Sequence, residues 1–279
     1  MHKKEHQGAK ISAGILKGLV FASAALTFLV LFFLIVYILV HGIPNLTPQL
    51  FAWKYTSENA SMLPSIINTL IIVILSLVIA VPLGIFSAIY LVEYAKRGNK
   101  FVKIIRLTTE TLSGIPSIVY GLFGMLFFVT ALHWGMSLLS GALTMVIMVL
   151  PLIMRTAEEA LKSVPDSYRE ASFGLGAGKL RTIFTIVLPS AVPGILAGVI
   201  LAIGRVVGET AALLYTSGTV AAVPNSLMGS GRTLALHMYV LSSEGLHVNQ
   251  ASATAVVILA FVLVINGLSG LVARKIAKG

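Results

Sequence analysis

The 279-residue chain is 57% hydrophobic and 11% charged, contains no cysteine and carries a formal net charge of +10 at pH 7. Soluble domains average about 25% charged residues, and several apolar runs here exceed the roughly 18 residues of a membrane span, which excludes a soluble domain. The lack of cysteine excludes disulfides, iron–sulfur clusters and cysteine-bound zinc. The basic residues form short clusters between apolar runs, which favours a membrane surface over nucleic acid as their partner.

Six apolar segments predict an all-α integral membrane protein with about six transmembrane helices. The first segment superficially resembles a secretory signal, but it is too long and has no convincing cleavage site, so we expect a retained helix. An N-terminal segment, residues 1–18, precedes a transmembrane domain at 19–273. The expected helices lie at residues 19–40, 65–92, 112–132, 135–154, 192–214 and 251–273.

The positions of lysine and arginine predict the orientation of the chain, because short cytoplasmic loops carry an excess of positive residues. The N-terminus, the second loop, the fourth loop and the C-terminal tail at 274–279 together hold 17 of the 20 Lys and Arg. Lys54 and Arg232 fall on the opposite side, and Arg205 falls within a span. Both termini are therefore expected to be cytoplasmic.

Two loops are longer than the connections usual between bundled helices. The external loop at 215–250 includes an expected short helix at 234–241. The cytoplasmic loop at 155–190 predicts a helix that begins near Tyr168, with Asp166 or Ser167 as its cap, and ends in a glycine turn. A second short helix at 179–188 is expected to stop before Pro189. The pattern indicates a helix-turn-helix that protrudes from the membrane.

The cytoplasmic loop resembles the signature of the membrane subunits of type I ABC importers. That signature is Glu-Ala-Ala, a later Gly, and Ile-x-Leu-Pro; here Gly176 follows Glu170 by six positions and Pro189 follows it by nineteen. Ala171, Ile186 and Leu188 also match, and Ser172 replaces the second Ala.

This resemblance implies a MetI-like permease fold in the bacterial inner membrane, with the loop as a coupling helix. A coupling helix docks on a cytoplasmic dimer of ATP-binding subunits. The alternative is a solvated amphipathic loop that lies on anionic lipid headgroups. The residues implied in coupling are Arg169, Glu170, Ala171, Ser172, Gly176, Ala177, Leu188 and Pro189, with Glu170 expected to pair with a nearby basic residue.

The chain lacks an ATPase site of its own. The nearest candidate for a phosphate-binding loop, residues 174–180, lacks the first Gly at the required spacing and the Ser or Thr after Lys179. We therefore expect no cofactor and no metal bound by this chain, no enzymatic activity, and ATP hydrolysis by a partner subunit.

Two charged residues, Arg205 and Glu209, lie in the fifth span on the same predicted helix face as Gly194 and Gly198. Gly194–Gly198 and Gly204–Gly208 are spacings that allow close helix approach, so this face is expected to contact protein. In one interpretation the pair neutralises itself and locks packing. In the other, Arg205 binds an oxyanion in a translocation cavity while Glu209 orients it.

A second resemblance bears on this choice. The runs Arg205–Ala211 and Gly114–Gly124 are similar to motifs of permeases from phosphate-specific Pst importers. The resemblance implies phosphate as substrate, an extracytoplasmic phosphate-binding protein, a second related permease (PstC-like) and membrane lipid as partners, with no nucleic acid. Ser117, Tyr120 and Thr210 are candidate hydroxyl donors to the anion.

Alternatives to phosphate import remain open at this point. Within the same class of importer, the alternative substrates are another oxyanion or a phosphonate. A protein of a different class, a self-sufficient carrier or channel, predicts an internal inverted repeat, which the sequence does not show. Glu93 and Glu110 are expected to be solvated helix ends near the inner membrane edge.

Overall fold

The computed structural model describes residues 2–96 and 98–276, with side chains described from residue 13 to residue 271 except at position 97. Arg97 and residues 277–279, which belong to the expected cytoplasmic clusters, lie outside the described residues. Every regular element in the described part is a helix, which confirms the all-α prediction.

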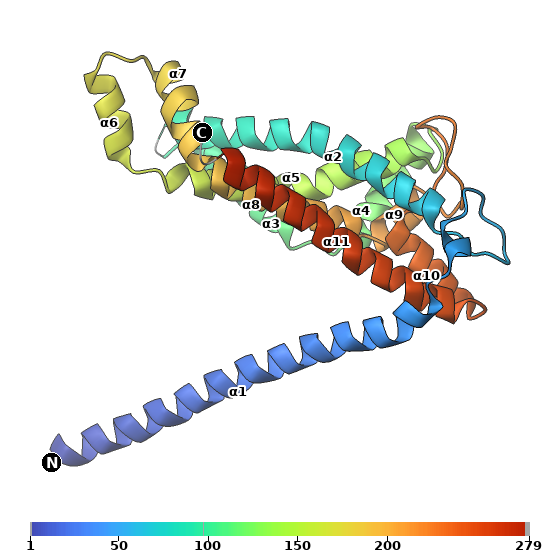
Figure 1. The fold of residues 1–279 in the computed structure, drawn as a ribbon. Coiled ribbons are helices and arrows are strands. Elements are labelled where there is room, and N and C mark those ends of the chain that lie inside the picture. Colours follow the sequence, from blue (N-terminus) through green and yellow to red (C-terminus); the bar gives the residue numbers. More distant parts are fainter. Residues whose placement is uncertain (1, 97, 277–279) are drawn as a thin grey trace.

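The helices form an elongated bundle with short elements at both ends (Figure 1). One end carries α6 and α7, and the other carries α10; we call them the α6–α7 end and the α10 end. The α-helices are α1 (His2–Gly42), α2 (Leu63–Ile89), α3 (Lys100–Ser113), α4 (Ser117–Gly124), α5 (Leu138–Lys162), α6 (Asp166–Gly174), α7 (Lys179–Thr182), α8 (Leu188–Val207), α9 (Ala211–Thr216), α10 (Leu234–Glu244) and α11 (Val248–Ile276). Short 3-10 turns are η1 (Ile43–Asn45) and η2 (Pro48–Phe51), and π-helical segments are η3 (Tyr90–Tyr94), η4 (Met125–Ala131) and η5 (Ile183–Val187).

Five helical stretches of the described residues are long and apolar enough to cross a membrane, and there are six if the bent pair Lys100–Ser113 and Ser117–Ala131 is counted as one span. The continuous stretches are Ala13–Asn45, Leu63–Tyr94, Leu138–Lys162, Lys179–Val207 and Val248–Leu271. The chain is therefore a multi-pass membrane protein. Helix α1 begins at His2, so the described backbone of the expected N-terminal segment at 1–18 is helical and continuous with the first span.

The expected third helix, 112–132, is wrong in its bounds. Two helices, α3 and α4, meet at residues 114–116 with a bend of 103° between the arms Lys100–Ser113 and Ser117–Ala131. Pro116 has no N–H to donate and disfavours the helical conformation at the preceding Ile115, so the chain breaks there. The apolar pattern does not predict α3 because this helix contains several charged residues.

Two further bounds differ at the α6–α7 end. The helix expected at 135–154 continues in α5 to Lys162, because Arg155 pairs with Glu159 and Lys162 with Glu158 one turn apart. The expected helix end before Pro189 is also wrong, since helical backbone runs from Lys179 to Val207. The π-helical η5 precedes Pro189 and shifts the hydrogen-bond pattern where the proline cannot donate.

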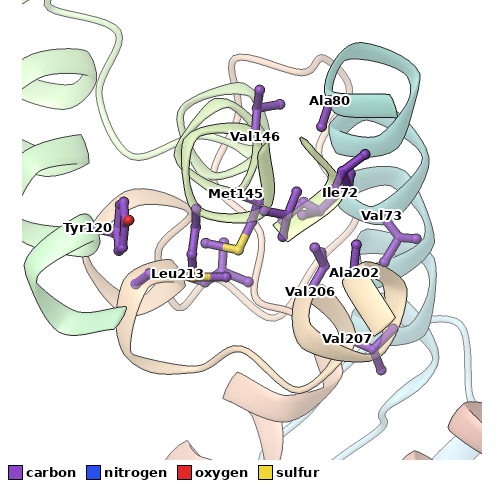
Figure 2. Packing of buried hydrophobic residues seen from close by; sticks show 14 of the residues in the cluster. Ile72, Val73, Ala80, Tyr120, Met145, Val146, Ala202, Val206, Val207 and Leu213 are labelled. Atoms are coloured by element: carbon purple, nitrogen blue, oxygen red, sulfur yellow. The ribbon is translucent and has the colours of Figure 1, made fainter. Parts of the chain in front are cut away.

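The core lies between α2, α5 and α8. Figure 2 shows Ile72 and Val73 of α2, Met145 of α5, and Ala202 and Val206 of α8 directed toward a common interior. Close approach of α5 and α8 depends on small residues. A Cβ atom at Gly194 would lie 2.7 Å from Cβ of Ala160, and one at Gly198 would overlap the Thr156 side chain. The expectation of a protein-facing Gly194–Gly198 pair is confirmed.

The Gly204–Gly208 spacing does not serve helix packing. A Cβ atom at Gly204 would meet nothing within 4 Å, and Gly208 follows the last residue of α8. Within the described chain, only the first of the two predicted spacings is therefore a helix-packing contact.

Helix α1 leaves the bundle and is inclined away from it (Figure 1). Its apolar window is not buried anywhere inside the chain. Its last turn does contact α11, where a Cβ atom at Gly42 would overlap the backbone of Ser252. The described part of α1 is thus anchored to the bundle at its C-terminal end.

We predict that Gly198→Leu disrupts the packing of α8 on α5, because the added side chain has no space beside Thr156. Overpacking of this kind costs about 1–3 kcal/mol. Thermal unfolding in detergent, followed by size-exclusion chromatography, should show a clear loss of stability. Gly204→Leu is the matched control and should leave the transition temperature unchanged, since the space there is open. Equal effects of the two substitutions would contradict the packing role.

Candidate functional site

The helix that carries Arg205 ends before Glu209. Arg205 lies in the last turn of α8, Gly208 follows the helix, and α9 begins at Ala211. A one-turn pairing of Arg205 with Glu209 requires a continuous helix, and the break removes it. Among the described residues no ion pair joins these two side chains, so this structure does not contain the self-neutralising pair.

Each of the two charges lies at a helix end instead. The Glu209 side chain accepts a hydrogen bond of 3.0 Å from the backbone N–H of Ala212, in the first turn of α9, and Glu209 is 8% exposed. Arg205 is half-buried beside the free carbonyls at the C-terminus of α8. Negative charge is favourable at a helix N-terminus and positive charge at a C-terminus. The break therefore accommodates both charges while leaving Arg205 without a carboxylate partner in the described chain.

The two sequence motifs for an oxyanion meet in space, because α4 packs on α9. A Cβ atom at Gly121 would lie 2.7 Å from Cα of Ala212. One at Gly124 would overlap Thr144 and lie 2.7 Å from Cγ2 of Thr216. Glycine at both positions allows the two backbones to touch. The run Gly114–Gly124 thus lies directly against the helix that Glu209 caps.

The candidate hydroxyl donors occupy different environments. Tyr120 is buried in the core cluster with Val206 and Leu213 (Figure 2), and its hydroxyl donates 2.7 Å to the carbonyl oxygen of Leu112. This hydrogen bond connects α4 to α3 across the break, so the Tyr120 hydroxyl proton is not available to an anion. Ser117 is half-buried at the first residue of α4, and Thr210 is half-buried at the cap position of α9.

Arg169 fixes the α6–α7 end to the bundle. Its guanidinium forms an ion pair of 2.8 Å with Glu93 and donates to the carbonyl oxygens of Val164 and Leu161 at 2.8 and 3.0 Å. The Arg169 and Glu93 side chains are 14% and 8% exposed. The expectation of a solvated Glu93 is therefore wrong. Glu170, expected to pair, is exposed and forms no ion pair in the described part of the chain.

The turn between α6 and α7 is closed by specific contacts. The buried hydroxyls of Ser172 and Thr182 lie 2.8 Å apart, and Ala177 N–H donates 3.1 Å to the Ser172 carbonyl. Gly176 has φ +82, a left-handed conformation that favours glycine. The helix cap is Pro165, not the expected Asp166 or Ser167.

The α6–α7 end presents an exposed, partly apolar tip. Leu175 is 89% exposed, and Tyr168, Phe173 and Leu180 are exposed as well. A groove of about 370 Å³ between the two helices is lined by Ala171, Ser172, Gly176 and Ala177 among others. Leu188 is half-buried and Pro189 is exposed; both lie at the start of α8 rather than at the tip. A rigid tip with exposed leucine is suited to contact another protein.

A buried cluster at the α10 end was missed from the sequence. Arg232 is 3% exposed and its guanidinium lies over the Tyr55 ring, 4.5 Å from the centroid. The His237 ring meets the same tyrosine edge-on at 6.1 Å. Burial and the nearby Arg232 lower the pKa of His237 to about 3, so its ring is neutral at physiological pH. Arg232 thereby joins the segment that precedes α10 to the segment between η2 and α2.

Comparison with protein families finds a match over residues 80–278 to the family described as "Binding-protein-dependent transport system inner membrane component". Among curated proteins, the "Probable ABC transporter permease protein YqgI" of Bacillus subtilis is 33% identical, and the alignment covers 96% of this chain and 98% of that protein. The "Phosphate transport system permease protein PstA 1" of Mycobacterium tuberculosis H37Rv is 39% identical over 64% of this chain and 55% of that protein.

Solved structures share the fold at low sequence identity. A bacterial alginate ABC transporter, in complex with an alginate-bound periplasmic protein, contains a chain with a TM-score of 0.70 and 16% identity; the match covers 95% of both chains. The inward-facing MetNI methionine ABC transporter contains one with a TM-score of 0.58 and 17% identity, covering 87% of this chain and 97% of that chain. The predicted MetI-like fold is thus confirmed.

We predict that Arg169→Ala loosens the α6–α7 end. The substitution leaves Glu93 and two carbonyl oxygens without their donor, and breaking such a buried pair costs of the order of 3 kcal/mol. Limited proteolysis in detergent should cleave residues 165–182 faster than in the unsubstituted protein. Arg181→Ala is the control, because Arg181 is exposed in the same region. Unchanged cleavage of the Arg169 variant would contradict the anchoring role.

Proposed function

The chain belongs to the family of binding-protein-dependent transport system inner membrane components and is a permease subunit of an ABC importer, and we propose that the anion it carries is inorganic phosphate. Relatives named as phosphate permeases support this choice of substrate. The relative that aligns along nearly the whole chain is named only as a probable permease, so its name does not specify a substrate.

The observation that carries the proposal is the state of Arg205. It is a half-buried guanidinium at the end of an apolar helix, with no ion pair among the described residues. A charge at membrane depth costs at least about 2.5–3.5 kcal/mol on insertion scales, so it requires a partner or a cavity. A guanidinium fork matches the oxygens of a phosphate in two parallel hydrogen bonds.

Glu209 would tune this binding. The Glu209 carboxylate accepts a hydrogen bond from the N–H of Ala212. It lies four residues after Arg205 but forms no ion pair with it in the described chain. A fixed negative charge near the site weakens anion affinity and so permits release. Ser117 and Thr210, both half-buried, would supply hydroxyl donors to the anion, whereas Tyr120 would position α4 through Leu112.

The proposed assembly contains several other subunits. The α6–α7 end, with Arg169, Glu170 and Gly176, would be the coupling helix that docks on a cytoplasmic dimer of ATP-binding subunits. ATP would be hydrolysed there, and this chain would bind no cofactor. A second, related permease would complete the passage, and an extracytoplasmic phosphate-binding protein would dock near residues 215–250. This arrangement places both termini in the cytoplasm and the chain in the bacterial inner membrane, consistent with the charge pattern.

We predict that Arg205→Ala reduces phosphate uptake at least tenfold, because one charge-assisted hydrogen bond is worth about 1.5–3 kcal/mol. Arg205→Lys should also impair uptake, since an ammonium cannot make the paired contact. Uptake of radiolabelled phosphate in cells, with immunoblots of membrane fractions, measures this.

Arg155→Ala is the control for the arginine substitutions, because Arg155 is exposed and its one ion pair among the described residues is with Glu159. If the Arg205 variants are absent from the membrane, a packing role explains the loss. If sulfate or a phosphonate competes with labelled phosphate as well as phosphate itself does, the substrate assignment fails.

We further predict that the α6–α7 tip contacts the ATP-binding subunit. The natural chain has no cysteine, so Leu175→Cys introduces a single thiol at an exposed position. A bifunctional reagent should link it to the ATP-binding subunit in native membranes. Trp53→Cys, exposed near the α10 end, should give no such product.

Two results would contradict the docking assignment. One is a thiol at position 175 that reacts only with lipid-phase reagents. The other is phosphate accumulation by vesicles that contain this chain without any ATP-binding subunit, which would instead support a self-sufficient carrier.

A further inference from the structure

A second cationic site lies near the α6–α7 end, on different elements from Arg205. A cavity of about 500 Å³ opens between η3 with the turn that follows it, the start of α3 and the end of α5. Four cations line it, namely Lys96, Lys103, Arg106 and Lys162, and its described lining includes no carboxylate. Nothing in the proposed transport cycle uses these residues.

The nearest acidic partner neutralises only part of this charge. The buried Glu158 forms ion pairs with Arg106 at 2.7 Å and with Lys162 at 2.6 Å, which joins α3 to α5. Lys96 and Lys103 form no ion pair among the described residues and are exposed. The cavity therefore keeps a net positive charge, and two of its lysines are available to an anion.

An apolar groove continues from this cavity. It has a volume of about 370 Å³ and is lined by Leu83, Phe86, Tyr90, Phe101 and Ile105 among others. Leu91 lines both spaces, so they adjoin. The groove lining includes no charged residue.

The shape of α3 fits a position at the membrane surface. The bend of 103° turns it away from the direction of α4. Its residues Phe101 and Ile104 are exposed apolar side chains, whereas Lys103 and Arg106 lie on another face. A helix with separate apolar and basic faces lies in the interfacial plane of a bilayer.

We propose that these two spaces together bind one anionic glycerophospholipid of the adjacent leaflet. The headgroup phosphate contacts Lys96 and Lys103, and an acyl chain fills the groove beside Phe101. Basic pockets between transmembrane helices on the cytoplasmic side bind acidic headgroups. The assignment of this leaflet as cytoplasmic rests on the orientation proposed above. Free phosphate would use the lysines but would leave the apolar groove without a role.

The test uses the full importer complex in bilayer discs of phosphatidylglycerol and phosphatidylcholine in equal amounts. Native mass spectrometry measures the phosphatidylglycerol that remains bound after release from the discs. The variant Lys96→Gln/Lys103→Gln should lower the affinity by about 30-fold, since each lysine near an anionic surface is worth about a factor of five to six. Lys17→Gln/Lys100→Gln removes the same number of charges outside the cavity and should retain the lipid.

A third variant separates the two sources of the anion. Ser87→Phe fills the apolar groove and should lower phosphatidylglycerol retention, while binding of inorganic phosphate, measured in lipid-free detergent, should not change. Equal lipid loss from both lysine pairs would overturn the proposal, because it would indicate general surface charge. Displacement of the lipid by inorganic phosphate with no effect of Ser87→Phe would also overturn it. The lipid-binding measurement requires no transport, so the lipid proposal can be refuted whether or not phosphate is the transported anion.

Discussion

The described chain interrupts its helices at residues 114–116 and 208–210, and the helices that follow these two breaks, α4 and α9, pack on each other. Inside a bilayer no water satisfies free backbone groups or charges, so the chain must satisfy them itself. Tyr120 donates to the carbonyl of Leu112 across the first break, and Glu209 accepts from Ala212 across the second. Arg205, in contrast, has no ion-pair partner among the described residues. The proposed anion site depends on that remaining charge.

The helical stretch Lys179–Val207 links this charge to the α6–α7 end. At 1.5 Å per residue, its 29 residues extend about 43 Å. Glycine contacts with α5 hold the middle of this stretch, and the Arg169–Glu93 pair holds the adjoining α6–α7 end to η3, which continues α2. A displacement at the tip would therefore reach the α8 end as movement of packed helices rather than as bending of a loop.

Much of this fold was predictable because membrane spans and signature spacings are local properties of the sequence. The spans at 65–92 and 251–273 coincide with α2 plus η3 and with α11 within a few residues. Local patterns failed where partners are distant: Glu93 was read as a solvated end because Arg169 is 76 residues away. The helix end after Arg205 was missed because Val206 and Val207 continue the apolar run. The Arg232–Tyr55 contact likewise joins segments that no sequence periodicity relates.

In the described chain, only the last turn of helix α1 packs on the bundle, and its apolar window is not buried there. Lipid tails are as apolar as its leucines and phenylalanines, so packing supplies little restraint. Its apolar stretch of residues 19–40 would extend about 33 Å, close to the roughly 30 Å hydrocarbon thickness of a bilayer. The inclination of α1 is therefore governed by hydrophobic mismatch, and a thinner or thicker membrane would tilt this helix while the remaining helices keep their mutual angles.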